Sequence, residues 1–340
     1  MATLSNLRGL LLEEAVLFLL SRTAYKTVFV KGTDPTLGNS SAGLTVKGRG
    51  SVHQIDAIAD SLINHPFSYP QRLLVEAKCF ARTKPVGLDI VRGAVGVLKD
   101  VSEYWVTIAG AVAQQRYHYQ YAVFSATGYS RETQKYAFAH DIYLIPLAAS
   151  QFFQPVIEAI RQVESVTPGR KEPDEIVVSM KGLRHYVRAR LHEQILPQDP
   201  APNDLAKLRG LEPFFIACRH VGFALLAVLG SRFPVFLVPA PNVHIHGLQD
   251  EYSVRIFRDG IDRTWFLRDR DTNRNLFSFE LPRELFLQYA KHGMLSAQAA
   301  LDLKEAALAE FQAFTVRDGQ MRIVRFRLDQ DWLGQLRNQL

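Results

Sequence analysis

Residues 73–80, LLVEAKCF, have the character of a buried β-strand that is interrupted by one acid and one lysine. Side chains at positions i and i+2 of a strand point to the same face, so Glu76 and Lys78 share one face. The preceding apolar stretch carries Asp56 next to Ile55. Pairing of the two strands would place Asp56 beside Glu76. Two carboxylates held this close repel each other unless a cation lies between them.

Oxygen ligands of this kind suit Mg²⁺ or Mn²⁺. Such an ion lowers the pKa of a bound water and neutralises charge that develops on a phosphate. We therefore predict that Asp56 and Glu76 bind the metal of a phosphodiester-hydrolysing site. Lys78 would orient the attacking water, help to deprotonate it, or stabilise charge on the phosphate. The alternative is an ordinary ion pair on the surface of an edge strand.

Hydrophobic spacing predicts the elements that must position these residues. Apolar residues recur at helical intervals near the N-terminus and after the LLVEAKCF strand, and the Ser130 hydroxyl can cap a later helix. Apolar runs bounded by turn residues predict strands. The predicted order is a helix at 5–22, strands at 25–32, near Ile55 and at 73–80, a helix at 86–104, a strand at 117–128, a helix at 130–141 and a strand at 142–147. This order is typical of a compact sheet flanked by helices.

The length of 340 residues allows two domains. Composition changes at 166–210, where Pro- and charge-rich stretches flank one basic helix. We therefore expect an α/β domain over 1–165, a linker with the basic helix over 166–210, and a smaller α+β domain over 211–340. In the last domain we expect an apolar helix within 214–230, hairpin-like strands and a short terminal helix.

Three stretches, in order, resemble the PD-(D/E)XK nuclease superfamily and, more narrowly, its Mrr-type restriction endonuclease domain. They are LEEAVLFLLSRTAYKTV, then GRGSVHQIDAIAD with RLLVEAKCF, and then VFSATGYSRETQKYAFAHDIYLI. The resemblance covers roughly residues 8–147. His53 and Gln54 stand where the family often has Asp and Gly before its metal-binding Asp, and Glu76-x-Lys78 stands where many members have Gln-x-Lys.

The resemblance implies a restriction-endonuclease-like mixed sheet and a metal-dependent endonuclease that cuts DNA in restriction or anti-phage defence. Carried over, Asp56 and Glu76 bind Mg²⁺ or Mn²⁺, Lys78 serves the water, and Glu13 is an accessory acid; alternatively, Glu13 lies at the solvent boundary of its helix. A homodimer and a protein partner or activator of the C-terminal domain are further expectations. Two alternatives stay open: a catalytically silent nuclease fold that binds nucleic acid or regulates a partner, and a nuclease for RNA or branched DNA.

Basic side chains outside the Asp–Glu–Lys set are candidates for contact with nucleic acid. Lys84 and Arg92 flank the set in sequence, although ordinary surface cations are an equal interpretation. The basic helix MKGLRHYVRARL is the stronger candidate for binding a phosphate backbone, through Lys181, Arg184, Arg188 and Arg190. The strands after residue 250 alternate arginines with aromatics, which suits backbone contact and stacking. They also carry aspartates, so a solvated mixed-charge sheet is the alternative.

Five further polar residues have a structural interpretation beside a functional one. His53 and Gln54 precede Asp56 and are candidates for contact with substrate, but we expect them to stabilise a turn. Asp60 would lie on the same face of the strand as Asp56, and we expect it to end the strand and not to bind metal. His244 and His246, in VHIHG, would share a strand face and form a Zn²⁺ pair, but no further ligand is evident nearby.

Composition places few limits on partners. The net charge of +6 and the pI near 9.3 are compatible with a polyanionic partner such as DNA. Two cysteines cannot form a disulfide framework, so we expect a reducing, cytoplasmic setting. The apolar N-terminus carries charges and lacks the pattern of a signal peptide, so we expect a helix there. The apolar run within 214–230 is interrupted by charge and is too short to span a membrane.

Overall fold

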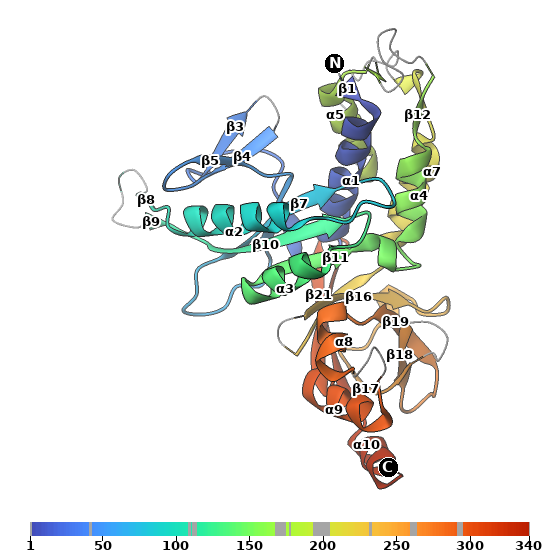
Figure 1. The fold of residues 1–340 in the computed structure, drawn as a ribbon. Helices are drawn as coiled ribbons and strands as arrows, with labels where there is room; N and C mark the ends of the chain where they lie inside the picture. The colour runs from blue at the N-terminus through green and yellow to red at the C-terminus, as the bar shows by residue number, and fades with distance from the viewer. Residues whose placement is uncertain are drawn as a thin grey trace. The chain divides into compact units, whose positions relative to one another are not determined.

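The computed structural model divides into two compact units, shown as a ribbon in Figure 1. The first unit contains residues 1–21 and 25–222, and the second contains residues 22–24 and 223–340. The residues that the structure describes are 2–40, 43–107, 110, 114–166, 175–176, 178–192, 205–230, 233–258, 264–290 and 295–339.

A mixed sheet forms the centre of the first unit. Its strand order is β11-β10-β7-β6-β2. The two hydrogen-bonded pairs β7–β10 and β10–β11 are parallel, whereas β6–β7 and β2–β6 are antiparallel. The predicted α/β class with a mixed sheet is therefore confirmed. The strands are β2 (Tyr25–Thr27), β6 (Ala57–Ser61), β7 (Gln71–Lys78), β10 (His118–Ser125) and β11 (Ile142–Pro146).

The central strands of this sheet carry apolar side chains, which helices cover and so remove from water. Helix α1 (Leu4–Ser21) contacts β2, β6 and β7. Helices α2 (Leu88–Ser102) and α3 (Arg131–Ala139) contact β10 and β11, and Val91 and Ala94 of α2 pack with Leu74 of β7 in one buried cluster. Ser130 accepts a hydrogen bond from the backbone N–H of Thr133 and so caps α3. These helices lie close to their predicted ranges.

A small antiparallel sheet of β3 (Leu37–Ser40), β4 (Gly43–Lys47) and β5 (Val52–Gln54) precedes β6. Its last loop is tied to α2 by Asp100, which accepts hydrogen bonds from the backbone of Gly50 and Ser51 and lies 2.7 Å from His53 Nε2. The His53 side chain therefore contacts helix α2, next to the loop between β4 and β5.

Further helices of the first unit are η1 (Leu147–Ala149), α4 (Gln154–Gln162), α5 (Met180–Leu191) and α7 (Leu211–Val221). Two-residue strands pair as β1 (Ala2–Thr3) with β13 (Glu175–Ile176), β8 (Val106–Thr107) with β9 (Gln114–Gln115), and β12 (Glu164–Ser165) with β14 (Leu208–Arg209). No helix in the described part of the chain has the length and apolar character that crossing a membrane would require.

The second unit is a closed barrel with strand order β15-β16-β19-β18-β17-β21-β20. Strand positions alternate between buried and more exposed, and the buried side chains form one core with α9 and α10. The strands are β15 (Leu225–Leu229), β16 (Phe233–Pro239), β17 (Glu251–Arg258), β18 (Thr264–Asp269), β19 (Asn275–Glu280), β20 (Glu310–Arg317) and β21 (Gln320–Leu328). The helices are α8 (Arg283–Tyr289), α9 (Ala297–Ala307) and α10 (Gln330–Asn338).

Two expectations for this part of the chain are wrong. The apolar run within 214–230 is not one helix, because α7 ends at Val221 and Leu225–Leu229 forms a barrel strand that pairs with β16 and β20. VHIHG is not a strand, since Ile245–Gly247 forms the short 3₁₀ helix η2. A continuous apolar run has no periodicity that distinguishes a strand from a helix. Its secondary structure therefore depends on the distant elements with which it pairs.

Several arginines of the barrel strands lie against acids, whereas Arg258 and Arg268 lie over the rings of Phe286 and Phe257. Arg255 is 2.9 Å from Asp329, Arg327 is 2.9 Å from Glu251, and Arg325 pairs with Glu251 and Glu310. These contacts correspond to the mixed-charge interpretation of the strands.

Arg72 is the centre of a buried polar network in the first unit. Its side chain is 1% exposed. The guanidinium donates to Asp60 at 2.6 and 3.0 Å, to Asp34 at 2.7 Å and to the Thr36 hydroxyl at 2.9 Å. Asp60 is thus the ion-pair partner of the strand residue opposite it, because Asp60 and Arg72 are paired in register. The network joins β6, β7 and the segment that leads into β3.

We predict that Asp34→Asn destabilises the protein by about 1–3 kcal/mol at neutral pH, because a buried donor of Arg72 loses its charged acceptor. Burial alone raises the pKa of Asp34, but hydrogen bonds from Thr36 and the charge of Arg72 lower it below its usual value. The contribution is therefore present above the unfolded pKa and is lost as the pH falls through the folded pKa. Urea unfolding curves at pH 7 and pH 3 measure this change.

The control is Glu103→Gln, which removes the partner of Arg49 in an ion pair whose side chains are 73% and 40% exposed. We expect it to cost about 1 kcal/mol or less. Equal losses in the two variants, or a difference that grows as the pH falls, would contradict the assignment of Asp34.

Candidate active site

Asp56 lies at the bend between β5 and β6, and the backbone fixes its side chain. The antiparallel register pairs Ala57 with Val75, so Asp56 lies beside the end of β7. The backbone N–H of Ala77 donates a 2.9 Å hydrogen bond to Asp56 Oδ2. The adjacency of Asp56 and the LLVEAKCF strand, expected from two paired strands, therefore occurs in the structure.

Glu76 and Lys78 point from β7 toward the same place. Lys78 Nζ contacts Glu76 Oε1 directly and lies 3.9 Å from Asp56 Oδ2. All three side chains are about one-fifth exposed, between 19% and 22%. Burial alone lowers the pKa of Lys78, but the charge of Glu76 raises it above its usual value. The set is therefore two carboxylates bridged by an ammonium group that keeps its charge at neutral pH.

Tyr121 is a further member of the set that sequence reasoning did not identify. Its hydroxyl donates a 3.0 Å hydrogen bond to Glu76 Oε2. Tyr121 lies on β10, where it is paired in register with Leu74 of β7. Burial and the charge of Glu76 raise the pKa of Tyr121, so it remains a donor. The only available signal was its place in the strand predicted at 117–128, since the β7–β10 pairing is long-range.

Glu13 reaches the same region from helix α1. Its side chain is 16% exposed, and Arg184 Nη2 lies 2.7 Å from its Oε2. Burial raises the pKa of Glu13 to about 7; Arg184 opposes this rise, and the charge of Asp56 adds to it. Burial and the charge of Glu76 raise the pKa of Asp56 to about 6. Negative charge is therefore crowded here, which is the electrostatic setting that a bound cation relieves.

The donor set fits a hard divalent ion that keeps part of its water shell. Among the described residues, no group of three or more His, Cys, Asp or Glu side chains converges as a metal cluster. Structural zinc sites need four protein ligands, whereas Mg²⁺ is commonly held by one or two carboxylates and several waters. Asp56 and Glu76 can supply those two carboxylates.

The four basic residues predicted on the helix MKGLRHYVRARL differ in their surroundings. Arg188 donates two hydrogen bonds to Glu14, at 2.9 and 2.6 Å, and Arg184 contacts both Glu13 and Glu14. Glu14 itself is completely buried. Arg190 pairs with Glu212 at 2.9 Å. Lys181 is exposed and makes no hydrogen bond or ion pair with any residue that the structure describes. Helix α5 is thus fixed to α1 by buried charge and leaves one cation unpaired.

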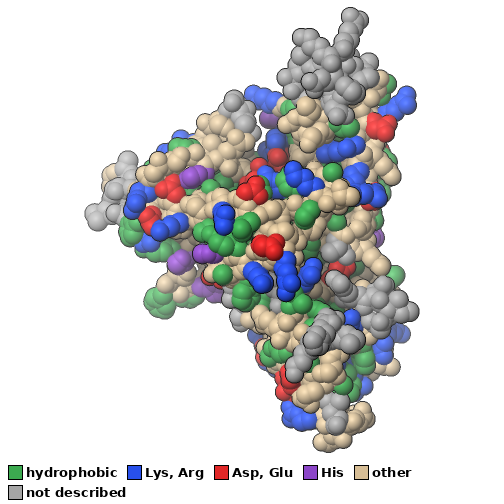
Figure 2. Space-filling model, viewed as in Figure 1, with side chains coloured by type: hydrophobic (Ala, Val, Ile, Leu, Met, Phe, Trp, Pro, Cys, Tyr) green, Lys and Arg blue, Asp and Glu red, His purple; other side chains and the backbone are tan. Residues whose placement is uncertain are grey.

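Lys84 and Arg92 are both exposed. Lys84 Nζ lies 4.9 Å from the ring centre of Phe80, and the Arg92 guanidinium lies 5.9 Å from that of Tyr136. Their contact with nucleic acid stays a prediction. The face of the molecule in view in Figure 2 mixes Lys and Arg with Asp and Glu side chains, so the small net charge is not gathered into one uniform patch there.

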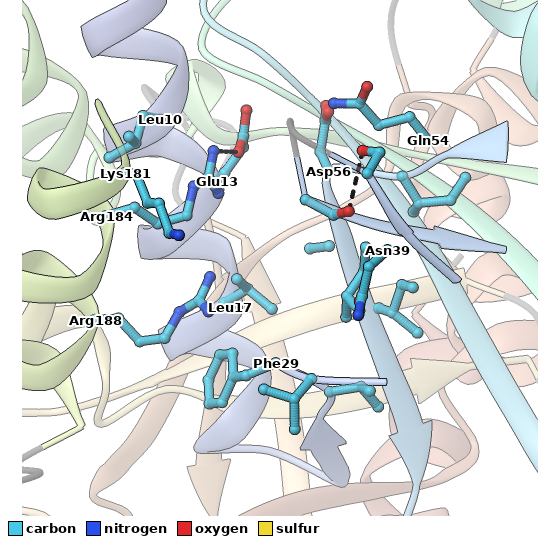
Figure 3. A pocket seen from close by; sticks show the side chains of 18 of the residues that line it. Leu10, Glu13, Leu17, Phe29, Asn39, Gln54, Asp56, Lys181, Arg184 and Arg188 are labelled. Atoms are coloured by element: carbon cyan, nitrogen blue, oxygen red, sulfur yellow. Dashed lines mark hydrogen bonds and ion pairs between the residues drawn. The ribbon is translucent and has the colours of Figure 1, made fainter. Parts of the chain in front are cut away.

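A pocket of about 980 Å³ opens beside Glu13 and Asp56. Figure 3 shows Lys181, Arg184 and Arg188 of α5 on one side of it, and Asp56, Gln54 and Asn39 on the other. Leu10, Leu17 and Phe29 also line it. Asp56 is therefore accessible from a polar cavity within the first unit.

No known family model matches the chain, and no curated protein matches it. Three solved structures overlap with it weakly. A protein of unknown function, AF1548, has 18% identity and a TM-score of 0.33 over 63% of this chain and 98% of its own. The DNA modification-dependent restriction endonuclease AspBHI has 13% identity and a TM-score of 0.24 over 39% of this chain and 27% of its own. The MspJI restriction endonuclease, in complex with a 27-mer oligonucleotide, has 14% identity and a TM-score of 0.27 over 55% of this chain and 34% of its own. The chain thus spans about a third or less of each restriction enzyme.

We predict that Glu14→Gln destabilises the first unit by about 3 kcal/mol, because it removes the charge of a buried carboxylate that pairs with both Arg184 and Arg188. The matched control is Glu212→Gln, which removes the partner of Arg190 from a pair whose Glu side chain is 60% exposed. We expect that control to cost about 1 kcal/mol or less. Urea unfolding at neutral pH measures both variants, and equal effects would show that the Glu14 pairs do not hold α5 to α1.

Proposed function

We propose that the chain is a metal-dependent nuclease that hydrolyses phosphodiester bonds, with DNA as its substrate and Asp56, Glu76 and Lys78 as its catalytic residues. The observation that carries the proposal is the convergence of these three groups. The Ala77 amide holds one carboxylate next to a second, and a lysine ammonium contacts the second and lies 3.9 Å from the first. An ordinary surface ion pair consists of one acid and one base, so it does not account for the second carboxylate at this position.

Asp56 and Glu76 would hold Mg²⁺ or Mn²⁺. The chemistry that such an ion supplies when bound is a lowered pKa for water and neutralisation of charge on the phosphate. The residues of the chain determine the geometry. Tyr121 orients the Glu76 carboxylate, and the Ala77 N–H orients that of Asp56. Groups that are oriented before the reaction need no reorganisation when charge develops.

Lys78 has three N–H donors and no acceptor while it is protonated. Its ammonium group can donate to an attacking water, which fixes the direction of attack, or to a non-bridging phosphate oxygen, which offsets negative charge. Glu13 lies at the edge of the same region and is held by Arg184. We assign Glu13 an accessory role near the water shell of the ion.

DNA as the substrate, and restriction or defence as the setting, follow from the resemblance in residues 8–147 to the Mrr-type domain. The basic pI near 9.3 is compatible with a polyanion. The role of the barrel in target choice or partner binding belongs to the same proposal.

We predict that wild-type protein nicks or linearises supercoiled plasmid DNA with Mg²⁺ or Mn²⁺. Lys78→Ala and Asp56→Asn should each lose about 100-fold or more in rate, because each removes one oriented charged group from the reacting centre. The measurement is a time course on a gel, with single-stranded DNA and RNA as parallel substrates.

The control variant is Lys99→Ala, which removes an exposed lysine near the end of α2. It should cut at the wild-type rate. Cutting that persists in Lys78→Ala and Asp56→Asn would place the activity elsewhere. Absence of cutting of all three substrates with either ion would contradict the proposal and favour a silent nuclease fold.

A further inference from the structure

The pocket beside Asp56 has two chemically different walls. Helix α5 contributes cations to one wall, Lys181, Arg184 and Arg188. The small sheet β3–β5 contributes uncharged amides to the other, Asn39 and Gln54 (Figure 3). Among the described residues, the lining contains four Lys or Arg side chains and two carboxylates. Because Arg184 and Arg188 are paired with Glu13 and Glu14, the free positive charge of the α5 side is that of Lys181, whereas the β3–β5 side is rich in neutral hydrogen-bonding groups.

Both amides are available for a ligand. Asn39 and Gln54 are exposed, and neither side chain hydrogen-bonds to a residue that the structure describes. Their backbones are already paired within the sheet, Asn39 with Leu44 and Gln54 with Thr45. The strands thus hold two carboxamide groups at the rim of the pocket without using their donors and acceptors. Lys181, on the opposite wall, is unpaired in the same sense.

The size of the pocket limits what can enter it. A volume of about 980 Å³ is close to that of cavities that enclose drug-sized molecules, roughly 300–1,000 Å³. A nucleotide or a short run of nucleotides belongs to this class. One turn of duplex DNA is about 34 Å long and presents its bases only at the floor of its grooves. An unpaired strand presents its base edges directly, so it suits Asn39 and Gln54 better than a duplex, whose base edges are reached only through a groove.

We propose that the pocket binds one unpaired nucleic-acid strand, with its phosphates toward Lys181 and α5 and its base edges toward Asn39 and Gln54. The inference rests on the proposed function, since it gives the route by which a strand reaches Asp56. It also narrows the substrate class to nucleic acid with a single-stranded segment at the site of cutting. Cationic grooves that follow the backbone are the general means by which proteins hold single strands.

The two walls make separate contributions to binding. Lysine contacts to phosphate are independent of the base sequence. They release counterions from the nucleic acid, so they make the binding affinity depend on the salt concentration. Carboxamide groups pair with base edges, and Asn and Gln suit the N6 and N7 atoms of adenine. The amide wall should therefore make affinity depend on the base, and the α5 wall should not.

The test measures binding by fluorescence anisotropy in the Lys78→Ala protein, so that no strand is cut. The probes are labelled oligo-dA, oligo-dT and a duplex of the same length. We expect single strands to bind about tenfold more tightly than the duplex, since only they present unpaired base edges to Asn39 and Gln54, and oligo-dA to bind more tightly than oligo-dT. Adding Asn39→Ala and Gln54→Ala should weaken oligo-dA binding by about fivefold or more and reduce the preference for it.

Adding Lys181→Ala should weaken both homopolymers equally and lower the slope of log affinity against log salt by about 0.7, the value for one phosphate contact with a single strand. Matched controls are Gln312→Ala, an exposed strand glutamine of the barrel, and Lys99→Ala. Neither should change affinity or slope. Circular dichroism of every variant checks that the fold is kept.

The outcomes separate this inference from the proposed function. Equal binding of duplex and single strands, or binding unchanged by the Asn39, Gln54 and Lys181 substitutions, overturns the inference even if wild-type protein cuts plasmid DNA. Base-dependent single-strand binding that these substitutions remove supports it. If wild-type protein then cuts no nucleic acid, the nuclease proposal fails while the strand-binding site stands.

Discussion

The hydrogen bond from the Ala77 amide to Asp56 is the interaction on which the candidate site depends. Asp56 lies outside the regular strands, at a bend, and a carboxylate there would otherwise turn toward water. The 2.9 Å bond anchors it to the end of β7, one residue from Glu76 and Lys78. Because the donor is a backbone group of a strand that has a partner on each side, the carboxylate is held by the interior of the sheet. Two acids can then be kept side by side at a cost that the lysine partly offsets.

Two buried ion networks hold the elements around this anchor. At the other end of β7, Arg72 binds Asp34 and Asp60 and so fixes β6, β7 and the entry to the small sheet. On the helical side, Glu14 binds Arg184 and Arg188 and fixes α5 against α1. Buried charges are costly without partners but restrict geometry when they are fully paired. In this unit they determine where Glu13, Asp56 and the two walls of the pocket lie.

The same pairs explain why a basic helix does not act as a simple positive patch. Arg184 and Arg188 of α5 pair with acids of α1, and Arg190 pairs with Glu212 at the surface. Among the described residues of α5, Lys181 is the cation that lines the pocket without a partner. Arginine suits this structural role because its planar fork binds carboxylates bidentately. The electrostatic attraction for a polyanion at this site is therefore local and modest, and a bound metal ion would add to it.

The sequence by itself determined the parts whose physics is local. Period-two spacing placed Glu76 and Lys78 on one strand face, and helical spacing and the Ser130 cap located α1, α2 and α3. The bend at Asp56, the donor Tyr121 and the Arg72 network depended on which strands became neighbours, and contacts between residues 12 to 45 positions apart leave no local pattern. Barrel closure was decided in the same way, since β15 pairs with β20, more than 80 residues later. The inward direction of the α5 arginines likewise followed from packing, because a basic helix has the same sequence whether its charge faces solvent or a buried glutamate.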